Sequence, residues 1–250
     1  MVQRNRLWQR SGNVWFDGAG EIEKQKKAEK MLSEENSRKL FHKYCSLFDQ
    51  EKIKATLEFY ETRQEWKNYL DYRTLQSRIK HVDRIFYGDS ITAAWPLQEF
   101  FPACEFLNRA IPGDNVHGLF HRLRDDVLAY SPRQVFLLAG INGIDDPRLV
   151  ERITALAAII KAHGCEVFMS SILPLRHPDN WDRFQYQDKI VSDNAAIKQW
   201  AHSNGIGFID YHCHVKDESG QLAADFAMPD GTHITFKGYC RMAEVLSEHL

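Results

Sequence analysis

The sequence of 250 residues lacks several features that mark common classes of protein. It has no apolar run approaching the roughly 18 residues that a membrane-spanning helix needs, and residues 1–15 lack the continuous apolar core of a secretory signal. Its five cysteines are odd in number and scattered without a CxxC pair, which argues against a disulfide framework or a zinc knuckle. We therefore expect a cytoplasmic protein with reduced thiols and no membrane span.

Glycine and proline are absent from Glu21 to Lys80. Apolar residues recur there at helical spacing, as in Leu40, Tyr44 and Leu47. Strand patterning is nearly missing from this part of the chain. The pattern predicts two or three amphipathic helices.

Charge also divides the chain into two parts. Residues 1–80 carry 17 Lys and Arg against 12 Asp and Glu, and residues 81–250 carry 15 against 22. Acidic residues are interleaved with the basic ones in the first part, so solvated helix faces explain its charge better than a nucleic-acid surface. We predict an N-terminal helical extension over residues 1–80, without a nucleic-acid partner. Its aromatic residues are expected to pack on the following domain: Phe59, Tyr60, Trp66 and Tyr69.

The amphipathic helices of this extension must bury an apolar face somewhere. Either the following domain or a second copy of the chain can cover that face. We expect a helical annex that narrows access to a site in the following domain, supplies no catalytic group, and provides the contacts of any homo-oligomer.

Short apolar runs alternate with helical stretches from Asp83 onward. The runs are RIFYG, CEFLNRAI, QVFLLAG, CEVFMSSIL and GIGFIDY, and RLVERITALAAIIKAHG is one of the helical stretches between them. Continuous apolar runs of this length are typical of buried parallel strands in a sheet with helices on both faces. We predict a three-layer α/β/α domain over residues 81–250, built on a five-stranded parallel sheet. Functional groups in such a domain gather at the carboxyl ends of the strands.

Gly88, Asp89 and Ser90 follow the first of these runs. A structural explanation exists, because Asp and Ser cap helices and Gly provides the positive φ of a tight turn. Alternatively, Ser90 is a nucleophile, which requires a neighbouring base. The other strand ends decide between these interpretations.

Suitable partners for Ser90 follow the other strands. His233, near the chain end, is suited to act as a base because the ordinary pKa of histidine is about 6.5, and Asp230 can hold its other ring nitrogen. The backbone amides of Ser90 and Gly113 and the side-chain amide of Asn142 can donate to an oxyanion. Ordinary turns also explain each partner singly, but their joint occurrence at strand ends favours catalysis.

These residues resemble the SGNH, or GDSL, hydrolase superfamily over roughly residues 83–250. Its four blocks are matched in order by Gly88-Asp89-Ser90, Gly113 in IPGDN, Gly140-x-Asn142 and Asp230-x-x-His233. The resemblance implies a flavodoxin-like fold and a serine ester hydrolase that acts on small-molecule carboxylic esters without a metal or organic cofactor. It assigns the nucleophile to Ser90, the base to His233, the orienting acid to Asp230, and the oxyanion hole to Ser90, Gly113 and Asn142.

Two positions depart from the pattern of the superfamily. Gly143 follows Asn142 where the family often has Asp, and Ile234 follows His233 where it often has Pro. Neither departure removes a reacting group. The absence of a G-x-S-x-G elbow argues against the α/β-hydrolase fold.

Two other functions remain open at this stage. The same triad also serves acyl transfer to an alcohol, and a non-catalytic binding module can retain a hydrolase scaffold. The segment YHCHV raises a metal site as a further alternative, with His212, Cys213 and His214 in succession. If the segment is extended, Cys213 points away from the two histidines, and we expect no metal there.

Overall fold

The computed structural model describes residues 8–11, 14–63, 65–79, 82–177 and 182–250. A parallel sheet of five strands forms its centre: β3 (Arg84–Gly88), β4 (Phe106–Asn108), β5 (Gln134–Leu138), β6 (Glu166–Ser170) and β7 (Gly207–Ile209). Their order is β4-β3-β5-β6-β7, which is the flavodoxin-like order for consecutive strands. The predicted α/β/α fold with a five-stranded parallel sheet is confirmed. The strand order reverses between β3 and β5, so their carboxyl ends form the switch point where ligands bind.

An aromatic stack crosses the middle of the sheet. Phe86, Phe136 and Phe168 occupy matched positions on β3, β5 and β6. Neighbouring rings are stacked with centroids 4.7 and 5.0 Å apart. Such cross-strand pairs stabilise one register, which also fixes where each strand ends relative to the next.

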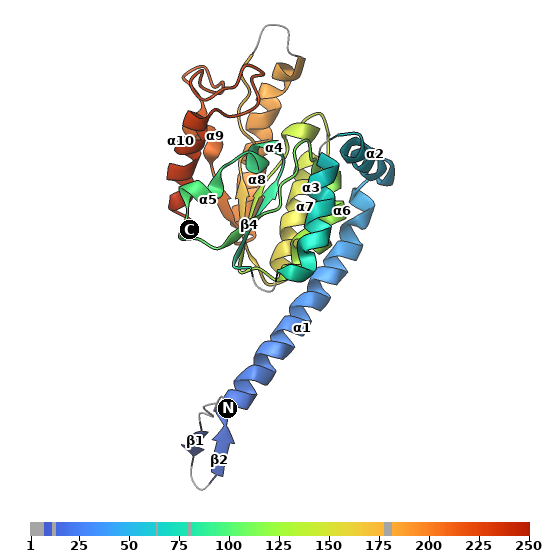
Figure 1. The fold of residues 1–250 in the computed structure, drawn as a ribbon, viewed down its shortest axis with the longest axis vertical. Helices are drawn as coiled ribbons and strands as arrows, with labels where there is room; N and C mark the ends of the chain where they lie inside the picture. Colours follow the sequence, from blue (N-terminus) through green and yellow to red (C-terminus); the bar gives the residue numbers. More distant parts are fainter. Residues whose placement is uncertain (1–7, 12–13, 64, 80–81, 178–181) are drawn as a thin grey trace.

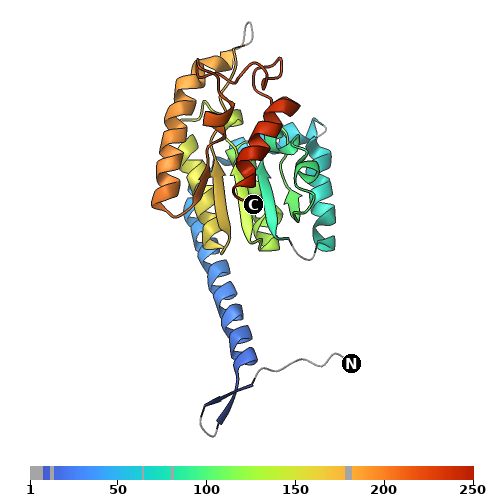
Figure 2. The same ribbon diagram turned by 90° about the vertical axis from the view of Figure 1, so that its left-hand side faces the viewer.

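Helices cover both faces of this sheet. One face is covered by α6 (Val116–Asp126), α7 (Leu149–Ala162) and α8 (Gln187–Ser203), which pack side by side. On the other face α10 (Phe236–Ser247) crosses in front of the strands in Figure 2. Shorter helices lie near the carboxyl ends of the strands or beside α10: α4 (Ser90–Ala93), α5 (Leu97–Phe100) and α9 (Tyr211–Val215). Single 3₁₀ turns occupy 45–47, 76–78, 128–130, 141–143 and 182–186.

The N-terminal part of the chain is helical, as predicted, with α1 (Gly18–Tyr44), α2 (Gln50–Glu61) and α3 (Glu65–Leu75). It is preceded by an antiparallel hairpin of β1 (Trp8–Ser11) and β2 (Val14–Asp17), which the sequence pattern did not indicate. Figure 1 shows the first part of α1 leading away from the body, with the hairpin at its far end. With 27 residues, α1 is about 40 Å long.

The rest of this extension packs on the sheet domain. Phe41 and Phe48 both stack on Phe120 of α6, with centroid distances of 4.4 and 3.9 Å. Helix α2 packs against α6, and Tyr60 of α2 is completely buried. The side chain of Trp66 lies outside the described residues. An independent domain boundary at residue 80 stays a prediction.

The segment YHCHV forms helix α9, so the extended conformation considered for it is wrong. The Asp210 carboxylate caps this helix by accepting from the amide of Cys213 at 3.3 Å. In the part of the chain that the structure describes, no three His, Cys, Asp or Glu residues lie together as metal ligands. None of the described helices combines the length and apolar character needed to cross a membrane.

Candidate active site

The turn after β3 presents Ser90 at the switch point. The Asp89 carboxylate caps α4, since its Oδ1 accepts from the amide of Ile91 at 3.0 Å. Asp89 therefore does the capping, and the Ser90 hydroxyl is left for another partner. The glycine before them has a different role from the one expected, because the φ of Gly88 is not positive. A Cβ on Gly88 would lie 2.1 Å from the carbonyl oxygen of Leu138, so glycine is needed for the close approach of β3 and β5.

Ser90, His233 and Asp230 form a continuous hydrogen-bonded chain. The Ser90 Oγ lies 2.9 Å from His233 Nε2, and His233 Nδ1 lies 2.5 Å from Asp230 Oδ2. A carboxylate can only accept, so Nδ1 carries the proton of the neutral ring and Nε2 accepts from the hydroxyl. This is the arrangement in which a histidine can remove a proton from serine.

The loop before α10 holds Asp230 in place. The Asp230 Oδ1 accepts from the amides of Thr232 and His233, both at 2.9 Å. Partial burial acts to raise the pKa of Asp230, but these amides and the ring of His233 outweigh it and hold that pKa below its ordinary value. Asp230 therefore stays ionised and keeps the ring oriented. The His233 side chain is 44% exposed, which leaves the ring open to water.

Two of the three candidate oxyanion donors, Gly113 and Asn142, come from the loops after β4 and β5. Gly113 has a φ of 76°, which favours glycine, and Asn142 donates from Nδ2 to the carbonyl oxygen of Asp114 at 2.9 Å. The second hydrogen on Asn142 Nδ2 remains available, because the amide carries two. Within the described residues, the backbone amides of Ser90 and Gly113 have no acceptor. The two backbone amides are thus not engaged elsewhere, and Asn142 keeps one of its two amide hydrogens for an oxyanion.

Gly140, the remaining glycine of the four blocks, has a φ of 135°. A Cβ there would lie 2.6 Å from Ile172 Cδ1, so this position needs glycine for both backbone and packing reasons. The position of Gly143 has room for a Cβ, since the nearest side-chain atom, Leu149 Cδ1, would lie at an ordinary van der Waals distance of 3.9 Å. The departure at Ile234 places a buried apolar side chain after His233.

A cavity of about 280 Å³ lies beside the candidate oxyanion donors. Gly113, Asn142 and Gly143 line one part of it, and Thr56 and Phe59 of α2 line another. Neither Ser90 nor His233 is part of its lining. Helix α2 of the N-terminal extension therefore lines a cavity next to the candidate oxyanion donors.

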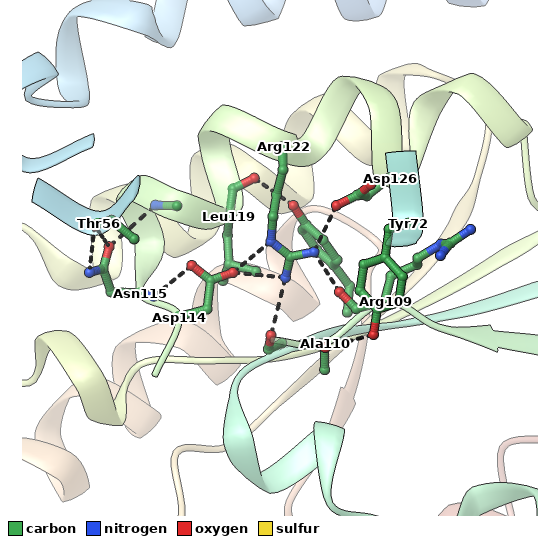
Figure 3. Close-up of polar contacts among 12 residues, drawn as sticks. Thr56, Tyr72, Arg109, Ala110, Asp114, Asn115, Leu119, Arg122 and Asp126 are labelled. Atoms are coloured by element: carbon green, nitrogen blue, oxygen red, sulfur yellow. Dashed lines mark hydrogen bonds and ion pairs between the residues drawn. The ribbon is translucent and has the colours of Figure 1, made fainter. Parts of the chain in front are cut away.

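A buried ionic network supports these loops, and our reading of the sequence missed it. The guanidinium of Arg122 on α6 binds Asp114 Oδ2 at 2.7 Å and Asp126 Oδ2 at 2.9 Å, as Figure 3 shows. It also donates to the carbonyl oxygens of Arg109 at 2.5 Å and Gly88 at 3.3 Å. All these groups are buried, so the network ties the loop after β4 to the end of β3. Its only sequence signal is a pair of charged residues at i and i+4 on the apolar face of a helix.

Comparisons with known proteins agree with this architecture. A model of the family described as GDSL-like lipase/acylhydrolase matches residues 86–241, more than half of the chain. The chain belongs to this family. All four motif blocks lie within the matched residues, and the family supports an ester hydrolase in general.

Solved structures include similar proteins. A GDSL-like lipase from Bacteroides thetaiotaomicron is 28% identical with a TM-score of 0.66, and the match covers 73% of this chain and 96% of that one. An acetylxylan esterase from Geobacillus stearothermophilus, 18% identical with a TM-score of 0.53, shares the fold over 68% of this chain and 96% of its own. A search of curated proteins found no match.

Proposed function

We propose that the protein is a serine ester hydrolase that works through an acyl-enzyme, with Ser90 as nucleophile. The observation that carries this proposal is the hydrogen-bonded chain from Ser90 Oγ through the His233 ring to Asp230. A serine hydroxyl is a weak nucleophile until a positioned base removes its proton. Membership of the GDSL-like lipase/acylhydrolase family supports the same chemistry.

Acylation begins when Ser90 Oγ attacks the carbonyl carbon of the ester. His233 Nε2 takes the hydroxyl proton as the new C–O bond forms, and the ionised Asp230 stabilises the resulting imidazolium. The carbonyl oxygen becomes an oxyanion that accepts from the amides of Ser90 and Gly113 and from Asn142 Nδ2. When this intermediate collapses, the bond to the alcohol oxygen breaks and His233 Nε2 gives its proton to the departing alcohol.

Deacylation repeats these steps with water in place of serine. Water attacks the acyl carbon, His233 takes its proton, and the bond to Ser90 Oγ breaks as the proton returns to the serine. The exposed face of His233 supports water as the acceptor, because solvent reaches the ring directly. Transfer of the acyl group to an alcohol remains a second outcome of the same chemistry, and product analysis with added alcohols separates the two.

The test is a kinetic comparison of Ser90→Ala, His233→Ala and the double variant on a series of p-nitrophenyl esters from acetate to palmitate. Each single variant is expected to lose about 10³-fold or more in kcat, and the double variant little more, because the two residues act as a unit. Losses that add in free energy would contradict a shared mechanism. Full activity of Ser90→Ala would overturn the role of Ser90 as nucleophile, whereas a parent protein that hydrolyses none of these esters and forms no fluorophosphonate adduct on Ser90 would favour a binding module.

A further inference from the structure

The N-terminal extension contacts the loop that carries Gly113, although the family match begins only at residue 86. The hydroxyl of Tyr60 on α2 donates to Asp114 Oδ1 at 2.5 Å. One turn earlier, the Thr56 Oγ1 accepts from the Asn115 side-chain amide at 3.0 Å, a contact drawn in Figure 3. Residues 56 and 60 share one helix face, so α2 holds two consecutive residues of this loop.

Phe59 of α2 covers the remaining part of the same loop. A Cβ placed on Gly113 would lie 2.5 Å from Phe59 Cε1, so the aromatic ring lies directly against this glycine. Phe59 and Gly113 also share the lining of the cavity beside the candidate oxyanion donors. The extension therefore restricts Gly113 itself as well as the two residues after it.

Asp114 connects the contacts of α2 to two candidate donors, the Gly113 amide and the Asn142 side chain. Its backbone nitrogen forms the peptide bond to Gly113, and its carbonyl oxygen accepts a hydrogen bond from Asn142 Nδ2 at 2.9 Å. A shift of Asp114 would therefore move the Gly113 amide and release the Asn142 side chain together. The position of this one residue determines the geometry of two of the three candidate donors.

The Asp114 carboxylate needs Tyr60 to complete its set of partners. Its Oδ2 is bound by Arg122, and its Oδ1 accepts from the amide of Asn115 at 2.9 Å and from Tyr60. Burial, together with the neighbouring Asp114 carboxylate, raises the pKa of Tyr60, so its hydroxyl stays protonated and remains a donor. A buried carboxylate that loses a hydrogen-bond donor is left with an unsatisfied oxygen, which is costly. The carboxylate is therefore expected to shift toward another donor or toward water.

We propose that Tyr60 is a positioning residue for the oxyanion hole and acts through Asp114. This inference rests on the proposed function and adds to it a role for the N-terminal extension. The extension then contributes to catalysis without touching substrate. A purely structural Tyr60 would affect melting temperature, whereas a positioning Tyr60 also affects kcat in a protein that remains folded.

The experiment compares Tyr60→Phe with Tyr72→Phe in the full chain. Tyr72, on α3 of the same extension, donates to the carbonyl oxygen of Ala110 at 3.0 Å, and among the described residues it has no hydrogen bond to Asp114. Both changes remove one hydroxyl from a tyrosine of the extension. Melting temperature, kcat and KM are measured for each variant with p-nitrophenyl acetate, beside Ser90→Ala as the inactive reference.

Tyr60→Phe is expected to lower kcat about 10-fold or more with KM within about threefold, because donors aimed at the oxyanion act in the transition state. Tyr72→Phe is expected to keep kcat within about twofold of the parent. A kcat for Tyr60→Phe within twofold of the parent, or no lower than that of Tyr72→Phe, would overturn the inference. If Ser90→Ala retains parental activity the proposed function itself fails, whereas an inactive Ser90→Ala with a fully active Tyr60→Phe refutes only the role of Tyr60.

If Tyr60→Phe does not fold, a second pair of variants tests whether α2 controls this loop. Thr56→Val removes the hydroxyl that accepts from Asn115, and Thr56→Ser keeps it. Loss of kcat in the first, restored in the second at unchanged KM, supports control of this loop by α2. Equal kcat in the two variants and the parent would overturn control of this loop by α2, and with it the role proposed for Tyr60.

Discussion

Ser90 and His233 are 143 residues apart in the chain, yet Ser90 Oγ lies 2.9 Å from His233 Nε2. The sheet places Ser90 at the end of its second strand in spatial order, and the loop before α10 carries His233 to it. A further contact fixes these two elements together, because the Tyr239 hydroxyl on α10 donates to the carbonyl oxygen of Ile91 on α4 at 2.8 Å. The geometry of the pair thus depends on the fold as a whole.

Asn142→Ala is expected to lower kcat about 10²- to 10³-fold with a much smaller change in KM, because the lost donor acts on the oxyanion. Steady-state kinetics on p-nitrophenyl acetate measure both constants. Asn204→Ala is the matched control, since Asn204 donates to Trp200 on an exposed surface. A rise in KM alone for Asn142→Ala would mean that this side chain binds the ground-state substrate.

Gly88→Ala is expected to destabilise the protein by roughly 2 kcal/mol or more, because the added methyl meets the carbonyl oxygen of Leu138 at the carboxyl ends of β3 and β5. Gly143→Ala provides the control, since its Cβ has no atom closer than 3.9 Å. Urea unfolding gives both free energies. Equal stability of the two variants would show that β3 and β5 are further apart than described here.

Asp89 gives the stability of the protein a specific pH dependence. Burial raises the pKa of Asp89 from 3.8 to about 7, and its Oδ2 has no hydrogen-bond partner among the described residues. The folded state therefore binds this proton more tightly than the unfolded state. The stabilising contribution is fully present below about pH 4 and is lost as the pH rises to about 7.

Asp89→Asn removes this titration and keeps an oxygen that can cap α4. The stability of the variant relative to the parent should therefore increase between pH 4 and pH 7, by an amount on the order of 4 kcal/mol if the full shift is expressed. Urea unfolding of both proteins at several pH values measures the difference. A difference that does not change with pH would contradict an Asp89 that is protonated in the folded state.

The exposed part of α1 is expected to serve association rather than catalysis. Ile22, Met31 and Leu32 are all more than half exposed, whereas Phe41 and Phe48 pack on the sheet domain. A chain that lacks residues 1–32 should keep kcat within about twofold and lose any homo-oligomer that the full chain forms. Light scattering gives the number of chains per particle in each protein. The same number for the full and the shortened chain would contradict association through α1.

Strands β3 and β5 were predictable because each is a continuous and almost entirely buried apolar run, within RIFYG and QVFLLAG. The role of Gly88 was not predictable, since it depends on the close approach of β3 and β5. The helical conformation of YHCHV was not predictable either, since it depends on a local cap from Asp210. The residues of the four blocks were recognisable because their order in the chain carries the signal. The contact of Tyr60 with Asp114 was not, because it depends on how an extension outside those blocks packs in three dimensions.

The central claim is that Ser90 is a nucleophile activated by His233. Its most direct test is reaction of the folded protein with a small fluorophosphonate, followed by peptide mapping by mass spectrometry. We expect one adduct per chain, attached to Ser90, with no adduct on Ser90→Ala and much slower labelling of His233→Ala. Failure of the parent protein to label, or an adduct on any other residue, would contradict this account.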